Sequence, residues 1–347
     1  RECLAVRTAV GLLDASTLGK IDIQGPDAAA FLDRIYTNLF SNLPVGRCRY
    51  GLMCREDGML FDDGVTTRLG EHHFHMTTTT GNAGAVLDWL EEWLQTEWRD
   101  LRVWCNSVTE QWAVIALAGP QAREVMRSLA PDLPLSPDAF PFLSMREARV
   151  AGVPARLFRV SFTGELSYEI NVPWDYGPAV WEAAMRAGEP YGIMPYGTEA
   201  MHVLRAEKGF VIVGQDTDGS VTPTDLGMDW ALSKRKDFLG RRSLARADMA
   251  RPDRKQLVGL LPADAGMVLA EGAQIIEPAG AAGTAMLGHV TSSYFSPTLG
   301  RGFALALLKG GRRRIGETVI AEDRGSRAEA RVVAPSFYDP EGERRDG

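Results

Sequence analysis

Adjacent carboxylates that follow a tyrosine form the first pattern with chemical potential. Tyr50 lies in a strand-like run that turns at Asp57-Gly58 and returns through Asp62 and Asp63. A positioned carboxylate can take up or release a proton. Because neighbouring residues of a strand face opposite sides, only one of Asp62 and Asp63 can face a shared cavity. We expect one of them to be a candidate catalytic group and the other to be solvated.

Two further segments combine turn glycines with acidic and aromatic residues. The run Phe-Thr-Gly-Glu-Leu-Ser-Tyr-Glu-Ile, which contains Glu165 and Tyr168, indicates a turn that enters a strand. The run Leu-Arg-Ala-Glu-Lys-Gly-Phe contains Glu207 and continues to Gly214-Gln-Asp216. Each segment alone is a weak signal, since carboxylates often only bind turn amides or lie on a helix surface. Their order and spacing along one chain make the combination specific.

Two groups of basic residues have simpler explanations. Alternation along a strand would bring His73 and His75 together beside His72, but no Cys or carboxylate at helix spacing accompanies them. We therefore expect an exposed strand of histidines and no metal site. The basic run from Lys234 to Arg242 is either a solvated turn or a positive island for an anionic ligand tail or a partner subunit.

The composition of the 347 residues excludes several classes of protein. A net charge of −7 argues against nucleic-acid binding, and four cysteines without a CxxC pair indicate a reducing cytoplasm. No run of 18 apolar residues and no signal-peptide pattern occurs, so we expect no membrane association. Walker, GxSxG and HExxH motifs are absent, and Gly280-Ala-Ala-Gly283 indicates a hairpin loop. The first residue is Arg1 instead of Met, which suggests a piece of a longer or processed polypeptide.

Two stretches share one design, and they must position the acidic segments. Each has an apolar strand, a Gly-Pro pair and an amphipathic helix, and the pairs at Gly25 and Gly119 are 94 residues apart. Further strand-like runs and a second helix, Ala83 to Trp98 in the first copy and Tyr176 to Ala187 in the second, follow. The repeat predicts an α+β fold made of duplicated β-α-β-β-β-α halves.

The texture of the sequence changes near residue 254. Short apolar strands punctuated by Gly and Pro replace the helical periodicity, which predicts a small C-terminal β-barrel or sandwich. The polar last residues indicate a loose tail. The expected organisation is a region 1–250 with halves of about 10–105 and 106–250, a barrel domain 251–340, and a tail 341–347.

Taken together, four motifs carry a resemblance to a known family. They are Gly-x-x-x-Asp-Asp ending at Asp63, Thr-Gly-Glu-x-x-Tyr-Glu-Ile ending at Ile170, Leu-Arg-x-Glu-x-Gly ending at Gly209, and Ser-Pro-Thr-Leu beginning at Ser296. In this order they resemble the glycine-cleavage aminomethyltransferase family and the folate domains of enzymes that oxidise dimethylglycine and sarcosine. Longer segments, such as the ten residues from Trp89, are similar to the alpha subunit of heterotetrameric sarcosine oxidases.

The resemblance implies a folate-binding fold and roles for particular residues. Asp62 matches the family's catalytic aspartate, which lies near the folate nitrogens that take up the one-carbon unit. Glu207 matches a glutamate that reads the two-donor edge of the pterin through both oxygens. Tyr50 matches a tyrosine near the pterin, and Glu165 and Tyr168 are motif positions expected to bind folate.

One departure from the family pattern concerns the end of a strand. The family usually has Asn-Ala-Gly where this chain has Thr79, Thr80 and Gly81. The asparagine of this chain, Asn82, is shifted to the position after the glycine. Thr80 is the expected folate contact at this place, and the contact that the family's asparagine makes is in question.

The resemblance also implies cofactors and partners. Tetrahydrofolate would bind this chain and capture the one-carbon unit from the oxidative demethylation of sarcosine as 5,10-methylenetetrahydrofolate. Glycine and hydrogen peroxide would be the other products of a complex with beta, gamma and delta subunits, in which FAD, FMN and NAD bind outside the motifs of this chain. A polyglutamate tail of folate would meet the basic run from Lys234 to Arg242. A stand-alone glycine-cleavage aminomethyltransferase and a non-catalytic folate-binding module are the alternatives.

Overall fold

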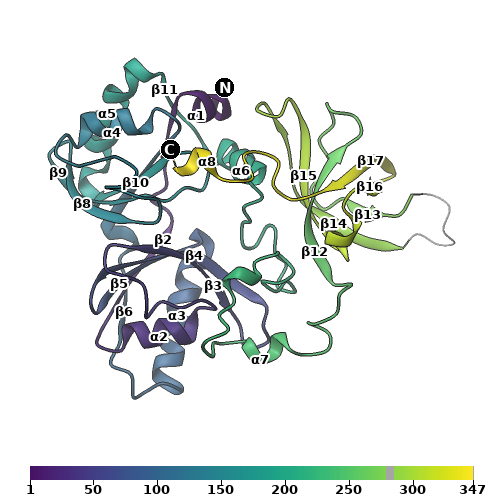
Figure 1. Ribbon diagram of the computed structural model, residues 1–347, viewed down its shortest axis with the longest axis horizontal. Coiled ribbons are helices and arrows are strands. Elements are labelled where there is room, and N and C mark those ends of the chain that lie inside the picture. Colours follow the sequence, from purple (N-terminus) through teal and green to yellow (C-terminus); the bar gives the residue numbers. More distant parts are fainter. Residues whose placement is uncertain (279–284, 347) are drawn as a thin grey trace.

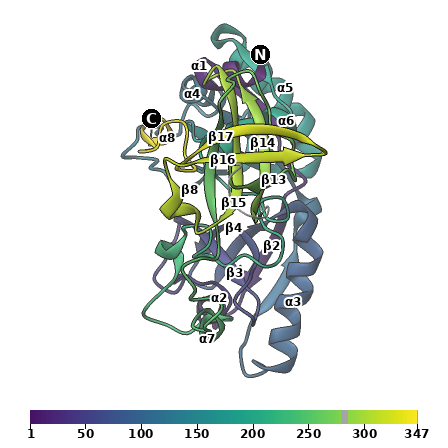
Figure 2. The same ribbon diagram turned by 90° about the vertical axis from the view of Figure 1, so that its right-hand side faces the viewer.

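The computed structural model describes residues 1–278 and 285–346, which form three units around a common centre (Figure 1). Two units are sheets covered by helices, and the third is a barrel at the right of the view. In the perpendicular view, the barrel strands lie in front of the other two units (Figure 2). The hairpin loop expected at 280–283 lies outside the described residues.

The first half is built on a five-stranded sheet with the order β3-β4-β5-β2-β6. Its strands are β2 (Gly19–Gln24), β3 (Cys48–Cys54), β4 (Leu60–Gly70), β5 (His73–Thr78) and β6 (Trp104–Ser107). Two helices, α2 (Ala28–Ile35) and α3 (Ala83–Thr96), pack on one face of this sheet, where Phe31 and Leu90 join Phe74 in an apolar core. Their apolar residues recur at helical spacing, so each helix buries one stripe.

The second half is built on a six-stranded sheet with the order β11-β1-β7-β10-β9-β8. Its strands are β1 (Val10–Asp14), β7 (Trp112–Ala118), β8 (Met145–Val150), β9 (Val153–Phe158), β10 (Ser167–Pro173) and β11 (Ile193–Pro195). Helices α4 (Ala122–Leu129) and α5 (Gly177–Gly188) cover one face of it. The N-terminal helix α1 (Glu2–Thr8) lies against β1 and β11.

The two sheets repeat one strand order, which confirms the predicted duplication. Strands β2 to β6 and strands β7 to β11 occupy equivalent places, and β1 is inserted into the second sheet beside β11. The shared glycine of the two Gly-Pro pairs has a steric cause. Gly25 and Gly119 have φ of +136° and +133°, and a Cβ there would lie 2.1 Å from Arg102 O and 2.6 Å from Ala9 O. Only glycine tolerates both conditions.

The sheet faces opposite α2 and α3 in the first half and α4 and α5 in the second face each other, and α1 and α6 cover part of this face of the second sheet. On β5, Phe74 packs beneath the helices of the first half, whereas His75 points the other way, as alternation along a strand requires. On β10, Tyr168 packs beneath the helices of the second half, whereas Glu169 points the other way. We call the region where these opposed faces meet the joint. It is lined by Val65, Thr67, His75 and Thr77 of the first half and Phe158, Val160, Glu169 and Asn171 of the second.

The third unit is a closed barrel with the order β12-β15-β14-β13-β16-β17, which confirms the predicted C-terminal β-barrel. Its strands are β12 (Lys255–Pro262), β13 (Gln274–Ile276), β14 (Met286–Ser296), β15 (Arg301–Lys309), β16 (Thr318–Asp323) and β17 (Ser326–Val333). Helix α6 (Thr198–Glu207), an irregular stretch and the short helix α7 (Arg241–Leu244) connect the second half to the barrel. An apolar cluster that joins Leu52 of β3, Ala206 of α6 and Leu305 of β15 holds the three units together.

The prediction of a loose C-terminal tail is wrong. The chain returns from the barrel to the second half and ends in a short helix, α8 (Glu343–Asp346). Arg159 donates hydrogen bonds of 3.2 Å to the carbonyl oxygens of Arg345 and Asp346, and Lys208 forms a 2.9 Å ion pair with Asp339. Two charged side chains of the returning segment, Asp339 and Arg344, pair with the buried side chains of Lys208 and Glu165. In the described part of the chain, no helix combines the length and apolarity needed to cross a membrane.

Candidate functional site

A tyrosine and a carboxyl group meet on the barrel-facing side of β3 and β4. The Tyr50 hydroxyl donates a 2.5 Å hydrogen bond to Asp63 Oδ2. The Tyr50 ring lies 6.2 Å from the ring of Trp230, a side chain that is 68% exposed. Burial, followed by the neighbouring charge of Asp62, raises the pKa of Asp63 to about 7. Asp63 can therefore hold or release a proton near neutral pH, which general acid or base chemistry requires.

Asp62, the expected catalytic aspartate, points to the other side of the sheet. It pairs with Met53, which packs in the core beneath α2 and α3, and its side chain is fully buried. It accepts hydrogen bonds from the Thr79 amide at 3.2 Å and the Asn82 side chain at 3.4 Å. Asp62 thus orders the loop that leads into α3. The expectation that the second aspartate is solvated is wrong, because Asp63 is half-buried and bonded to Tyr50.

The joint encloses a small cavity that is rich in hydrogen-bond acceptors. The cavity measures about 10 Å³, roughly the room for one water molecule. Asn171 Oδ1 and His75 Nε2, on side chains that are 2% and 1% exposed, have no hydrogen-bond partner among the described residues. Glu169 lines the same cavity, and burial raises its pKa to about 7 although the charge of Lys20 lowers it. A ligand with hydrogen-bond donors would complement this set of groups.

The histidine run is organised by a carboxylate on the neighbouring strand. Asp22 of β2 lies opposite His75, and its oxygens lie 2.7 Å from His75 Nδ1 and 2.8 Å from His73 Nε2. The expectation of an exposed strand of histidines is wrong for His75, which is buried. Although burial opposes it, hydrogen bonds from both histidines hold the pKa of Asp22 well below its usual range. Over residues 1–278 and 285–346, no cluster of three or more His, Cys, Asp or Glu side chains is placed to hold a metal ion.

Glu207 lies in a second cluster, organised by Arg7 of α1. Arg7 donates Nε and Nη2 to Glu207 Oε2 at 3.0 and 2.6 Å, and Nη1 to Glu165 Oε1 at 2.9 Å. The carbonyl oxygens of Thr163 and Leu204 accept its two remaining N–H groups. All five donors of the guanidinium are therefore used. Arg7 has no local sequence signal that would distinguish it from a surface arginine.

The carboxylate of Glu207 has little capacity left for a ligand. Its side chain has no exposed surface, and its second oxygen accepts a 2.6 Å hydrogen bond from Ser296. Oε2 already accepts two bonds from Arg7. A bidentate contact with two ligand donors needs free lone pairs on both oxygens. The structure therefore does not present Glu207 as a reader of a two-donor edge.

Glu165 belongs to the same cluster and connects it to the C-terminal tail. Arg344 Nε lies 2.8 and 2.9 Å from the two oxygens of Glu165. The Tyr338 ring lies 4.3 Å from the guanidinium of Arg7 and 5.8 Å from that of Arg344. Two positive and two negative side chains balance in this cluster, so each buried charge has a partner.

Two predicted folate contacts lie away from both clusters. Tyr168 is buried beneath the helices of the second half, with its ring 5.8 Å from that of Phe140. It points away from the joint, whereas its neighbour Glu169 lines the cavity. Thr80 is exposed at the start of a single helical turn before α3, with its hydroxyl 3.4 Å from that of Thr17.

The basic run from Lys234 to Arg242 divides into structural and exposed side chains. The Lys236 ammonium donates to the carbonyl oxygens of Asp33 and Tyr36, and burial lowers its pKa to about 8. Arg241 donates to the carbonyl oxygen of Lys236. The remaining basic side chains, Lys234, Arg235 and Arg242, are exposed.

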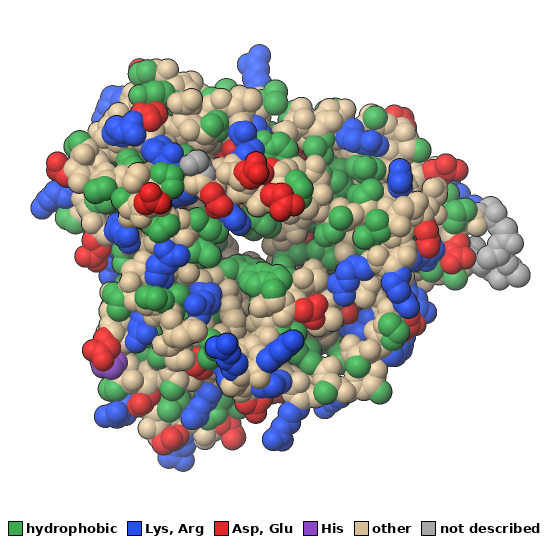
Figure 3. Space-filling view, in the orientation of Figure 1, with side chains coloured by type: hydrophobic (Ala, Val, Ile, Leu, Met, Phe, Trp, Pro, Cys, Tyr) green, Lys and Arg blue, Asp and Glu red, His purple; other side chains and the backbone are tan. Residues whose placement is uncertain are grey.

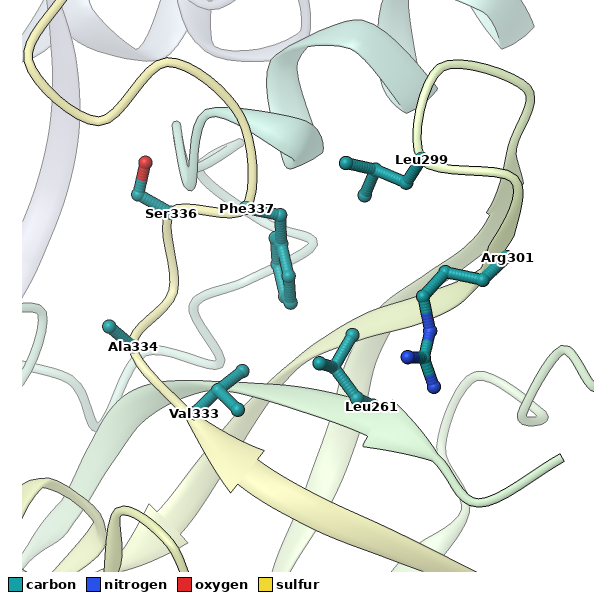
Figure 4. A pocket seen from close by; sticks show the side chains of 7 residues that line it. All are labelled: Leu261, Leu299, Arg301, Val333, Ala334, Ser336 and Phe337. Atoms are coloured by element: carbon teal, nitrogen blue, oxygen red, sulfur yellow. The ribbon is translucent and has the colours of Figure 1, made fainter. Parts of the chain in front are cut away.

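The molecule also has a larger pocket beside the barrel and a central opening. The pocket, of about 360 Å³, lies between the barrel and the returning tail, and Leu261, Leu299 and Phe337 line it together with Arg301 (Figure 4). It contains none of the predicted site residues. The space-filling view shows a separate opening through the centre of the molecule, where the three units meet (Figure 3). Strands β3 and β4, which carry Tyr50 and Asp63, border this centre (Figure 1).

Two duplicated α+β halves, a closed barrel and ionisable carboxyls between them define the aminomethyltransferase class of fold. A family model for the GCVT N-terminal domain matches residues 1–236, and one for the glycine cleavage T-protein C-terminal barrel domain matches residues 255–339. The chain belongs to this glycine cleavage T-protein family.

Relatives of two kinds share the fold. The sarcosine oxidase subunit alpha of Corynebacterium sp. (strain P-1) is 57% identical over 353 residues, which cover all of this chain and 36% of that protein. The aminomethyltransferase of Symbiobacterium thermophilum is 36% identical and covers 96% of this chain and 88% of that protein. A crystal structure of aminomethyltransferase T from Bartonella henselae has a TM-score of 0.85 at 26% identity, covering 98% of this chain and 89% of that one. The chain thus spans about a third of the length of the first relative.

Proposed function

We propose that this chain binds tetrahydrofolate with its pterin at the joint and its one-carbon acceptor nitrogens near Asp63. The observation that carries the proposal is the set of unpartnered acceptors on the side of the sheets that faces the other half. Asn171 Oδ1 and His75 Nε2 lack partners within the described residues, and Glu169 lines the same cavity. The 2-amino group and the adjacent ring N–H of a pterin form a two-donor edge that complements the carboxylate of Glu169 and Oδ1 of Asn171.

The roles expected of Asp62 and Glu207 belong, in this proposal, to Asp63 and Glu169. Both expected residues are fully buried and engaged by protein donors, so a ligand would have to displace those donors. Asp63 and Glu169 are half-buried carboxyls with pKa values near 7. Glu169 would accept the pterin edge, and Asp63 would act as acid, base or electrostatic stabiliser.

The other predicted contacts have different parts in this proposal. Tyr50 holds Asp63 and, with Trp230, offers aromatic surface at the edge of the central opening. Glu165 and Glu207 tie the units together through Arg7. Tyr168 contributes to the core and Thr80 to the start of α3. The enclosed cavity has room only for the ligand atoms that contact the acceptors. The bulk of the ligand would therefore extend toward the central opening.

The whole protein is proposed to oxidise sarcosine. The 57% identity to a sarcosine oxidase subunit alpha, against 36% to an aminomethyltransferase, favours this reading. Amine oxidation would occur at a flavin outside this chain, within an assembly that includes further subunits. Bound tetrahydrofolate would supply the nitrogens that capture the one-carbon unit as 5,10-methylenetetrahydrofolate. The four cysteines are free thiols, which fits a cytoplasmic protein.

Folate binding by matched variants tests the assignment. In calorimetric titrations with tetrahydrofolate, Glu169→Gln should weaken binding at least tenfold, because the amide carries a donor where the pterin presents donors. Glu207→Gln is the matched control at the other predicted position and should change the Kd less than threefold once folding has been verified. The reverse ranking would return the role to Glu207.

Product partition tests the role of Asp63. In the assembled oxidase, Asp63→Asn should release formaldehyde in place of 5,10-methylenetetrahydrofolate while sarcosine oxidation continues. Asp62→Asn is the matched control, since it alters the neighbouring carboxylate on the opposite side of the sheet. Unchanged partition with Asp63→Asn would indicate a folate-binding module without a catalytic part in the transfer.

The exposed part of the basic run is the proposed contact for a polyglutamate tail. Lys234, Arg235 and Arg242 are exposed, whereas Lys236 and Arg241 bind backbone carbonyls. Neutralising the three exposed residues should weaken tetrahydrofolate polyglutamate more than the monoglutamate, and the difference should shrink as salt is added. Equal losses for both ligands would contradict this contact.

A further inference from the structure

We infer that His75 takes up the proton of Glu169 when the pterin binds, so that the carboxylate is ionised inside the joint without loss of a proton to solvent. The inference rests on the proposed function. His75 is a positioning residue in this role, since it acts on the ligand through Glu169. It also gives the histidine run a function that neither a metal site nor a solvated strand provides.

The hydrogen bond to Asp22 determines which nitrogen of His75 is available. Asp22 Oδ1 lies 2.7 Å from Nδ1, and an ionised carboxylate can only accept. The neutral ring therefore carries its hydrogen on Nδ1 and presents the lone pair of Nε2. Nε2 is buried and without a hydrogen-bond partner in the described structure. Phe158 stacks on the ring at 5.8 Å and 22°, which holds it in place.

His75 and Glu169, which come from the two halves, line one small cavity. Both residues line the 10 Å³ cavity, which has room for about one water molecule. A water molecule in this cavity is the carrier that we propose for the carboxyl proton on its way to the imidazole. The Asp22–His75 pair resembles, in its chemistry, any carboxylate–imidazole pair in which the carboxylate fixes the tautomer and stabilises the imidazolium.

The charged groups around His75 define the two states. In the free chain, burial lowers the pKa of His75, opposed first by the hydrogen bond and then by the charge of Asp22. Arg156 of β9 and Lys20 of β2 also disfavour the imidazolium. Glu169 of β10 is protonated below about pH 7. An ionised Glu169 would add a negative charge to the cavity that His75 lines and so favour the imidazolium.

The transfer is balanced within the joint. The O–H bond of the Glu169 carboxyl breaks, and its electron pair stays on the carboxylate oxygen. The lone pair of His75 Nε2 forms the new N–H bond. Donors on the pterin edge then meet an anionic carboxylate, which accepts stronger hydrogen bonds than the neutral acid. Without His75, the same proton would have to leave to solvent.

Proton release during folate binding tests the inference. Titrate the 347-residue chain with tetrahydrofolate at pH 6 in two buffers with different ionisation enthalpies, and obtain the number of protons released from the difference in heat. The unaltered chain should release almost none. His75→Gln, which retains polar surface but cannot titrate, should release close to one proton, and its affinity should fall about tenfold per pH unit below pH 7. His72→Gln is the control, since the His72 side chain is 54% exposed.

Equal proton release by the unaltered chain and His75→Gln would overturn the inference while leaving folate binding intact. Absence of binding in every variant would instead overturn the proposed function, and the inference with it. Nitrogen NMR of the unaltered chain gives an independent test that does not depend on the variant folding. Nε2 of His75 should change from unprotonated to protonated on saturation with tetrahydrofolate, and an unprotonated Nε2 in the complex would contradict the transfer.

Discussion

At the scale of single residues, the orientation of a side chain separates chemistry from support. Asp62 and Asp63 are adjacent on β4, but one caps the loop before α3 and the other accepts a hydrogen bond from Tyr50. Tyr168 and Glu169 are adjacent on β10, but one belongs to the core and the other to the joint. In both pairs the residue that faces the other units has an ionisable carboxyl with a raised pKa.

The hydrogen bond from Tyr50 should tune Asp63. It stabilises the ionised carboxylate, so Tyr50→Phe should raise the pKa of Asp63 further. If Asp63 acts as a base, the rise of one-carbon transfer with pH should shift upward by about one unit. The pH profile of 5,10-methylenetetrahydrofolate formation measures this shift. Tyr36→Phe, which breaks a comparable bond to Thr66, should leave the profile in place.

Asp62 should matter for stability. Asp62→Ala leaves the Thr79 amide without its acceptor and removes one of the two acceptors of the Asn82 side chain, at a cost of about 1–3 kcal/mol in the free energy of unfolding. Urea denaturation of the variant, with folate affinity measured on the remaining folded protein, separates the two roles. A large loss of affinity at unchanged stability would restore Asp62 to the site.

At the scale of elements, two opposed sheet faces create a joint that no single strand reveals. The Gly-Pro repeat and helical periodicity allowed the halves and the barrel to be predicted, because amphipathic spacing determines which side of an element is buried. Adjacent acidic and aromatic residues did not reveal their orientation, since the pairing of β3 with β4 shifts register between Met53 and Cys54 of β3. Alternation on β10, where Tyr168 and Ile170 are core and Glu169 is not, was the available signal for Glu169.

Ion pairs and hydrogen bonds between residues that are far apart in the chain could not be predicted from the sequence. Arg7 is separated by 158 residues from Glu165 and by 200 from Glu207, so nothing local links them. The expectation for the histidine run fails for the same reason, because Asp22, the carboxylate partner of His75, lies 53 residues away on another strand.

The joint should give stability a pH dependence that Glu169→Gln removes. The folded-state pKa of Glu169 is raised to about 7 from an ordinary value near 4.5. The contribution of Glu169 to the free energy of unfolding is therefore fully present below pH 4.5. Up to about 2–3 kcal/mol of it is lost as pH rises toward 7. The free energies of unfolding of the unaltered chain and of Glu169→Gln, measured between pH 4.5 and 8, test the effect. Parallel curves would contradict a half-buried Glu169 with a raised pKa in the folded protein.

At the scale of the whole molecule, a balanced ionic cluster fastens the termini to the units around the centre. Arg7 of α1 binds Glu207 at the end of α6 and Glu165 in the turn before β10, and Arg344 of α8 binds Glu165. Ser296 of the barrel completes the contact with Glu207. The cluster therefore holds the elements that surround the central opening in position.

Removing the central cation of this cluster should destabilise the fold. Arg7→Met leaves Glu207 and part of Glu165 buried without compensation, at a cost of about 3–5 kcal/mol. Arg344→Met should cost less, because that side chain is 36% exposed and solvent can replace it. Thermal unfolding of the two variants gives the ranking, and an equal or reversed order would show that the tail, not Arg7, holds the cluster.

The most direct test of folate binding at the joint is a crystal structure of the chain with tetrahydrofolate. The pterin edge should lie within hydrogen-bonding distance of Glu169, with Asp63 near the nitrogens that accept the one-carbon unit. Density for the ligand in the 360 Å³ pocket on the barrel, or a pterin bound by Glu207 and Asp62, would contradict the assignment.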